Sequence, residues 1–512
     1  MLASDTNGAP MRLLKERIKS KLARGGIVIA GLVLGQILLY GPSLVGRKIL
    51  LPLDTLARPG VYLPTTPETG QLAPHDRIRA DLVYFLEPAR RFAVSEWHSG
   101  RVPMWTPYQF SGAPFIWPKF SPFSMLQCLT ASPVVLAWSQ LFAALVAGTG
   151  AYFFFRRVLG VGFWPAAVAA WCYPLTGFFV FWQGFPTCGA VHWLPWILLA
   201  THGAARQNSR WFPIWLSLVT GLVLVSGHLD VAAQVLIASG LFAIWSLYDA
   251  CHPQWIPGKV RRALLSLAIA WLLGFLLAAP HVLPAVEYAL SGARMDRRGT
   301  GEEERPPAGL SALPQIVLPD VYGTMGHGSL YLTKGNQLES AAATYAGLFA
   351  TLVLAPLAWY SQRHRKINLF LALISLFALS WCLNIPGLVD LLRIPGLNLL
   401  SHNRLVFIAS FALLTMTAVG LEVVSRDDLV WRPWSWLPPA VLCALCVWCF
   451  LRANGLPEPL ASQLEQAVSH GNRISWISDL DGVRQAQSWF VWHYRIAGIL
   501  CGTSLVLWCG LR

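Results

Sequence analysis

Long apolar runs separated by short polar segments cover most of the chain between residues 27 and 511. Runs of roughly 17–23 apolar residues can cross about 30 Å of hydrocarbon as helices. Backbone groups inside lipid need partners within their own segment, so such runs are expected to be helical. The pattern predicts about twelve transmembrane helices, at residues 27–45, 134–155, 163–182, 189–200, 211–226, 231–248, 263–279, 341–360, 367–382, 405–423, 436–451 and 489–511.

The composition agrees with a membrane protein. Hydrophobic residues make up 55% of the 512 residues and charged residues only 12%, whereas soluble domains contain about 25% charged residues. We therefore predict an all-α polytopic membrane protein, with a basic cytoplasmic segment at 1–26 and a single integral membrane domain at 27–512. No clear small-residue cleavage site follows the first apolar run, so an uncleaved span is expected there and not a signal peptide.

The distribution of basic residues predicts the orientation. The amino terminus and every loop on one side of the predicted layout carry Lys or Arg, and the positive-inside rule makes that side cytoplasmic. The short loops at 183–191 and 227–230, on the other side, contain no Lys or Arg. This alternation places both termini in the cytoplasm and the long polar loops 46–133, 280–340, 383–404 and 452–488 outside it. The net charge of +14 thus reflects membrane topology, and no nucleic-acid partner is expected.

Polar chemistry gathers in the external loops, whereas the predicted spans contain almost no ionisable residues. Transporters carry polar groups near the bilayer midplane, so this distribution favours an enzyme or an assembly factor acting at the outer surface. A lipid or glycan transporter (a flippase, for example) and a non-catalytic cell-envelope assembly protein remain alternatives.

The richest external stretch covers residues 81–114 of the first loop. Residues 81–98 have the apolar spacing of a helix that lies along a membrane surface. A Pro- and Gly-rich irregular segment follows. Asp81 is a candidate general base, because a carboxylate can take the proton from an attacking hydroxyl. The alternative for Asp81 is a helix cap or an ion pair with Arg79 or Arg90. Asp54, just after the first span, is the second candidate for the base.

Four arginines are candidates for binding phosphate, since a guanidinium can donate two parallel hydrogen bonds to it. They are Arg90, Arg91, Arg393 and Arg404, and anchoring at the membrane interface is the alternative for each. Candidates for contacting a sugar are Trp97, Trp105, Tyr108, His228 and His402. A further cluster comprises His281, Glu287 and Arg294. The His and Cys spacings predict no metal site, although assistance by a divalent cation is compatible with the sequence.

The stretch 81–114 resembles a pattern of the YfhO-like bacterial membrane proteins, which are similar to GT-C glycosyltransferases that use lipid-linked sugars. The matching positions are Asp81, Pro88, Arg90, Arg91, Gly100, Pro103, Met104, Trp105, Thr106, Pro107, Tyr108, Gly112 and Pro114. The segments LPLDTL, SGHLD, PHVLPAVEYALSGAR, TYAG and RIPGLNLLSHNR extend the resemblance over about residues 50–425. Thr106 stands where the family usually has Asn, and Leu229–Asp230 replace a common Pro–Gln pair.

The resemblance implies a GT-C-like fold in the bacterial cytoplasmic (inner) membrane, with interfacial helices in the first external loop. It implies a sugar donor linked to polyprenyl phosphate and a glycan, lipid or protein acceptor. Asp81 or Asp54 would activate the acceptor hydroxyl for inverting attack. Arg404, with Arg90 or Arg91, would stabilise the departing phosphate.

Overall fold

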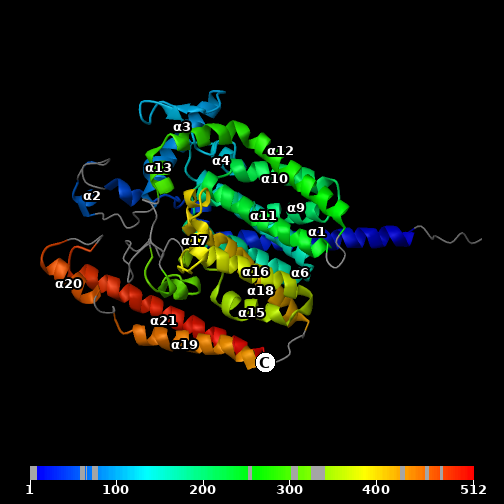
Figure 1. Cartoon of the computed structure of the whole chain (residues 1–512). Helices are drawn as coiled ribbons and strands as arrows, with labels where there is room; N and C mark the ends of the chain where they lie inside the picture. Colours follow the sequence, from blue (N-terminus) through cyan, green and yellow to red (C-terminus); the bar gives the residue numbers. More distant parts are fainter. Residues whose placement is uncertain are drawn as a thin grey trace, which may run out of the picture.

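A computed structural model describes residues 8–57, 64, 66–71, 79–251, 256–300, 309–324, 341–426, 433–455, 460–472 and 477–511. These residues are largely helical, and their one sheet is a two-stranded hairpin (Figure 1). They include eight helices that are long and apolar enough to cross a membrane, which confirms the predicted all-α membrane character. The eight are Lys21–Leu44, Val135–Leu159, Phe163–Phe181, Leu229–Cys251, Pro257–Leu290, His402–Ser425, Pro433–Arg452 and Leu480–Gly510.

The other four predicted spans are shorter helices. They correspond to α9 (Leu194–Ala205), α10 (Trp211–Val225), the helical segment Ala350–Tyr360 and α16 (Arg365–Leu379). A helix rises 1.5 Å per residue, so 11 to 15 residues span only about 17–23 Å of a hydrocarbon layer roughly 30 Å thick. Twelve complete crossings therefore stay a prediction.

Helix α18 (Val406–Ser425) occupies the centre of the main bundle. It is apolar on all sides and nearly all of its residues are buried, as expected for a helix surrounded by other helices. It packs on α6 (Phe163–Cys172), α15 (Ala355–Leu357) and α16. The packing is close: a Cβ placed on Gly420 would lie 1.9 Å from the carbonyl oxygen of Leu354.

The remaining helices of the main bundle surround this centre. They are α1 (Gly8–Leu44), α5 (Val135–Phe154), α9, α10, α11 (Leu229–Cys251) and α12 (Pro257–Leu290). Helix α12 pairs mainly with α10. Its outward side exposes a row of leucines, a composition suited to contact with lipid: Leu264, Leu265, Leu272, Leu273, Leu276 and Leu277.

A second hydrophobic core lies between α19 (Leu437–Arg452), α20 (Leu460–Ser469) and α21 (Leu480–Gly510). These helices form the orange and red layer along one side of the bundle (Figure 1). The layer joins the main bundle through the segments 316–322 and 348–357, whose apolar side chains belong to the same core.

The first large loop folds into a cap. It contains the π-helical turn η2 (Leu82–Leu86), α3 (Glu87–His98), the strands β1 (Trp105–Thr106) and β2 (Ala113–Pro114), and α4 (Pro122–Gln127). Pro88 in the first turn of α3 and the Ser121 cap of α4 explain where these helices begin. The strands pair in antiparallel register, with Trp105 opposite Pro114.

Short helices complete the structure: α2 (Pro67–Gln71), α7 (Gly177–Phe181), α8 (Thr187–Val191), α13 (Ala293–Thr300) and α17 (Leu388–Leu392). In Figure 1, α2, α13 and α20 lie at the left of the molecule, the start of α1 projects at the right, and α21 ends at the right-hand end of the orange and red layer. The orientation of the bundle in the membrane stays a prediction.

Candidate functional site

The candidate site lies where the beginnings of α11 and α18 meet. Arg404, in the turn that leads into α18, donates from Nη1 to Oδ2 of Asp230 at 2.7 Å. Asp230 is in the first turn of α11, and its Oδ1 accepts from the backbone N–H of Val231 at 2.8 Å. The Arg404 guanidinium carbon also lies 5.1 Å from the ring centroid of Trp182, within cation–π distance. These contacts fix a guanidinium beside a carboxylate and an aromatic ring.

Two further side chains hold the segment before α18 in place. Gln234 on α11 donates to the carbonyl oxygen of Ser401 at 2.9 Å. Arg298 on α13 donates to the Ser401 hydroxyl at 2.8 Å and to the carbonyl oxygen of Leu399 at 2.9 Å. Sequence reasoning missed Arg298, because its partners are about a hundred residues away in the chain and nothing in the local pattern indicates them.

Close backbone contact positions the loop that carries His228 and Asp230. A Cβ placed on Gly189 would lie 1.7 Å from the carbonyl oxygen of Ser226, and one placed on Gly227 would lie 2.4 Å from the carbonyl oxygen of Pro186. Such distances exclude any side chain at either glycine. The loop therefore lies directly against the segment that follows Trp182.

Arg404 has an unused donor. Its Nε is buried and has no hydrogen-bond partner within the described ranges. A buried N–H of a charged group without a partner is destabilising by about 1–3 kcal/mol or more. Such groups in a native structure commonly mark a place where a ligand, ion or water supplies the missing acceptor.

The two candidate bases lie on neighbouring turns of the cap. The Tyr84 hydroxyl donates to the carbonyl oxygen of Thr55, which ties the turn Leu53–Ala57, containing Asp54, to η2. Asp81 immediately precedes η2 and is exposed. The structure therefore brings the Asp54 and Asp81 segments together.

The Asp81 segment also reaches the segment that contains Trp182. Arg79 donates to the carbonyl oxygen of Val180 at 3.1 Å. A Cβ placed on Gly184 would lie 3.3 Å from the side chain of Leu82. In sequence, Asp81 lies between Arg79 and Leu82. Trp182 lies between their respective partners, Val180 and Gly184. Contacts therefore connect the Asp81 segment to the surroundings of Arg404.

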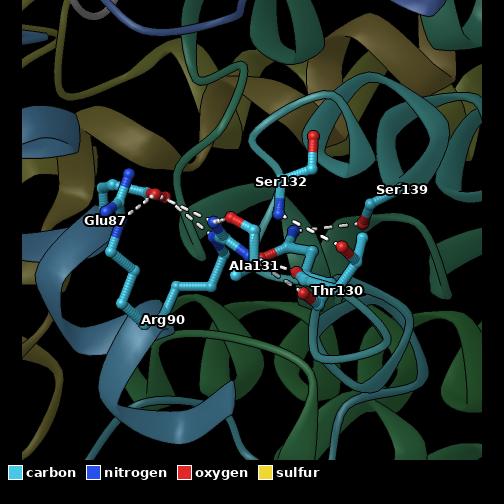
Figure 2. A network of polar contacts seen from close by, with 8 residues as sticks. Glu87, Arg90, Thr130, Ala131, Ser132 and Ser139 are labelled. Carbon is cyan, nitrogen blue, oxygen red and sulfur yellow. Dashed lines mark hydrogen bonds and ion pairs between the residues drawn. The ribbon is translucent and has the colours of Figure 1, made fainter. Parts of the chain in front are cut away.

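Arg90 has a structural role in the cap. It donates from Nε and Nη2 to the two carboxylate oxygens of Glu87, at 2.7 and 2.8 Å. Its other three N–H groups bind the carbonyl oxygens of Gln127, Thr130 and Ala131 (Figure 2). A guanidinium has five N–H donors, and all five are used in a side chain that is 1% exposed. Arg90 therefore joins α3 to the loop after α4 and has no donor left for phosphate.

Arg91 points outward from the same helix. It is exposed and donates from Nε to Oε1 of Glu87 at 2.9 Å. Burial alone would raise the pKa of Glu87, but the hydrogen bonds and charges of Arg90 and Arg91 lower this pKa below its usual value. Glu87 therefore remains ionised near neutral pH, and Arg91 keeps donors that face away from the cap.

The aromatic candidates Trp105 and Tyr108 lie on the hairpin. Trp105 covers Gly112, where a Cβ would be 2.9 Å from the indole ring. Tyr108 is 81% exposed and meets Phe92 of α3 edge to face at 5.8 Å between ring centroids. The hairpin packs on α3 and reaches α12, whereas Arg404 packs on α11. Trp97, also on α3, is partly buried against the core of the cap.

The predicted histidines occupy different environments. His228 is exposed and lies two residues before Asp230. His402 is buried against Trp381, at 4.9 Å between ring centroids. His281 is buried and meets Phe120 edge to face, whereas Glu287 on the same helix is exposed. The side chain of Arg294 lies outside the described residues.

A small cavity of about 60 Å³ lies beneath η2 and α3, lined by Leu82, Glu87, Gly184 and His192 among others. Ligand sites usually enclose roughly 300–1,000 Å³, so this cavity by itself is too small to enclose a typical ligand. Within the described part of the chain, no three or more His, Cys, Asp or Glu side chains are grouped to hold a metal ion.

In comparisons with known proteins, the chain matches no family model, no curated protein and no solved structure. Its function is inferred from the Arg404–Asp230 site and the carboxylates of the cap.

Proposed function

We propose that the protein is a membrane glycosyltransferase. It would move a sugar from a polyprenyl-phosphate donor to a glycan, lipid or protein acceptor at the external face of the bacterial cytoplasmic membrane. The observation that carries the proposal is Arg404, which lies beside Trp182 and Asp230 and whose buried Nε has no partner among the residues that the structure describes. An exposed carboxylate, Asp81, lies on a segment in contact with the same surroundings. The resemblance of residues 81–114 to the YfhO-like pattern supports the same reaction.

In the proposed reaction, Asp81 or Asp54 takes the proton from the acceptor hydroxyl. The acceptor oxygen then bonds to the anomeric carbon of the sugar. The bond between that carbon and the phosphate oxygen breaks, and its electron pair stays on the phosphate. Attack from the opposite side inverts the anomeric centre.

Arg404 would stabilise the negative charge that develops on the departing phosphate. Asp230 is a positioning residue, because it holds one edge of the guanidinium and leaves Nε and Nη2 to the substrate. Arg298, fixed on Ser401, adds positive charge to the same segment. Arg91 is a further candidate for phosphate at the outer face of α3.

The test uses the purified full chain in liposomes that contain polyprenyl-phosphate-linked sugars and candidate acceptors. We expect Arg404→Gln to reduce sugar transfer by about 10²–10³-fold, the usual effect of removing one such donor. Arg393, a further arginine candidate, pairs with Asp390, and its guanidinium carbon lies 5.8 Å from the centroid of the Trp381 ring, which contacts His402. Arg101→Gln is therefore the matched control, because Arg101 pairs with Glu96 on the cap. Equal losses in the two variants would refute the assignment of Arg404.

The identity of the base is tested with Asp81→Asn and Asp54→Asn, made separately. Loss of a general base reduces the rate by about 10²–10⁴-fold, so one variant should be far less active than the other. If both variants are folded and fully active, the proposed base is wrong. Movement of a lipid-linked glycan across the liposome membrane without sugar transfer would instead identify a transporter. If the protein shows neither sugar transfer nor transport, that result would favour an assembly protein.

A further inference from the structure

A second candidate site lies among the basic loops, away from the cap. It is a groove of about 530 Å³ between the end of α5, the middle of α9 and the beginning of α10. This volume is within the roughly 300–1,000 Å³ typical of ligand sites. The groove is lined by Phe153, Arg157, Trp196, Leu199, Trp211 and Trp215, together with four neighbouring residues.

Close packing forms the walls of this groove. Trp196 donates to the carbonyl oxygen of Val146 at 2.8 Å and meets Phe153 at 5.7 Å and Trp215 at 5.9 Å between ring centroids. A Cβ on Gly150 would be 2.6 Å from the Trp196 ring, so glycine is needed for that ring to sit against α5. The aromatic walls are therefore held in place by their neighbours.

The outer rim of the groove faces the surroundings of the bundle. Trp211 is 64% exposed, Ile214 51% and Leu218 47%. These residues occupy one side of α10, which packs on α9 and α12 through its other sides. Exposed apolar side chains at that position in a membrane protein are suited to contact with lipid chains.

Arg157 lines the polar end of the groove, and Arg210 adjoins the groove in the chain, between the lining residues Ser209 and Trp211. The Arg157 guanidinium lies 5.3 Å from the Phe153 ring centroid, and that of Arg210 lies 5.6 Å from the Trp211 ring centroid. Both side chains are exposed, and within the described ranges neither is paired with a carboxylate. Neighbouring Arg206, in contrast, is paired with Asp249. The groove thus has an aromatic interior and two cations with free donors at one end.

We propose that this groove binds an anionic phospholipid of the leaflet at the basic end, which the positive-inside rule makes cytoplasmic. One acyl chain lies along Trp196, Leu199 and Trp215, and the phosphate accepts hydrogen bonds from Arg157 and Arg210. Basic pockets between transmembrane helices on this side suit anionic headgroups. Tryptophan side chains are enriched at membrane interfaces, where one part of the ring system meets apolar chains and another meets polar groups. The proposal is independent of the glycosyltransferase reaction.

Native mass spectrometry of the full chain in detergent tests this site. Phosphatidylglycerol and phosphatidylcholine are added in equal amounts, and the lipid that stays bound is measured. We expect preferential retention of phosphatidylglycerol. The double variant Arg157→Gln/Arg210→Gln should bind it at least about tenfold more weakly, because hydrogen bonds to charged groups contribute enough for roughly one decade each.

Two controls separate the groove from general charge. Arg261→Gln/Arg262→Gln removes the same charge among the same basic loops but from outside the groove, and should retain the lipid as the unaltered protein does. Leu218→Trp fills the groove and keeps both arginines, so it should also lose the lipid, whereas Leu272→Trp on the outward side of α12 should not. Polyprenyl phosphate is added in a further measurement as a third lipid. The proposal would be overturned by equal retention of phosphatidylglycerol and phosphatidylcholine, by preferential retention of polyprenyl phosphate, or by equal losses in the two arginine pairs.

Discussion

At the scale of single residues, Arg90 and Arg404 show how the same side chain takes different roles. Arg90 has acceptors for all five donors and holds the cap together. Arg404 donates to one carboxylate, that of Asp230, and its buried Nε has no acceptor in the described part of the chain. Both arginines lie in the predicted external segments, so position in the sequence did not distinguish them. The two differ in the number of protein acceptors that the described residues place around the guanidinium: five for Arg90, which suits a structural role, and one for Arg404, which leaves donors for a ligand.

Arg90→Met is expected to destabilise the cap strongly. Removing one partner of a buried ion pair costs about 3–5 kcal/mol, because the other charge stays buried and unpaired. The unfolding temperature in detergent should fall clearly. Arg101→Met is the matched control, because the Arg101–Glu96 pair is on the same part of the cap but exposed, and it should change the unfolding temperature far less. Similar shifts in the two variants would contradict a structural role for Arg90.

The same ion pair should make stability depend on pH. The pKa of Glu87 is lower in the folded protein than its usual value near 4.3. A lowered folded pKa adds stability above the unfolded pKa, and this stability is lost as the pH falls through the folded pKa. The unfolding temperature, measured from pH 7 to pH 3, should therefore drop more steeply in the unaltered protein than in Glu87→Gln. Parallel curves would show that Glu87 does not titrate on unfolding.

At the scale of elements, close backbone approach positions the site. The loop before α11 lies against α8 because Gly189 and Gly227 carry no side chain. The central helix α18 approaches Leu354 for the same reason at Gly420. Glycine in a helix usually lowers stability by about 0.8–1.0 kcal/mol relative to alanine, so packing must compensate at the two helical positions, Gly189 and Gly420.

Gly189→Ala should displace the loop that carries Asp230, because the new methyl group would meet the carbonyl oxygen of Ser226. Overpacking of this kind costs about 1–3 kcal/mol, and both the unfolding temperature and sugar transfer should fall. Gly240→Ala on α11 is the control, since a Cβ there has no neighbour within 4 Å. It should leave the unfolding temperature unchanged or raise it. A harmless Gly189→Ala would show that the loop can relax.

At the scale of the whole molecule, the two candidate sites belong to different sets of loops of the helical bundle. The cap and the Arg404–Asp230 site belong to loops predicted to be external. The aromatic groove with Arg157 and Arg210 belongs to the basic loops. The proposed reaction and the proposed phospholipid site therefore require opposite leaflets.

Cysteine labelling tests this arrangement. Phe110 on the hairpin is 87% exposed, so Phe110→Cys should react with a membrane-impermeant maleimide in intact spheroplasts. Arg261→Cys, just inside α12, should react only after the membrane is permeabilised. The parent protein would carry serine at the exposed Cys443 and Cys509 to reduce background labelling. The reverse pattern would invert the predicted topology, and labelling of both sites in intact spheroplasts would place both loops outside.

The sequence by itself determined the helical membrane character, the positions of eight long apolar helices and the concentration of polar residues in the first loop. These features follow from apolar length and composition, which are local properties. It also indicated Asp54, Asp81 and Arg404 as candidates. Only the tertiary structure decided that Arg404 meets Asp230 and Trp182, and that Arg298 supports the same segment. The tertiary structure also decided that Arg90 joins α3 to the loop after α4. Those contacts join residues far apart in the chain, and hydrogen-bond satisfaction in three dimensions selects among them.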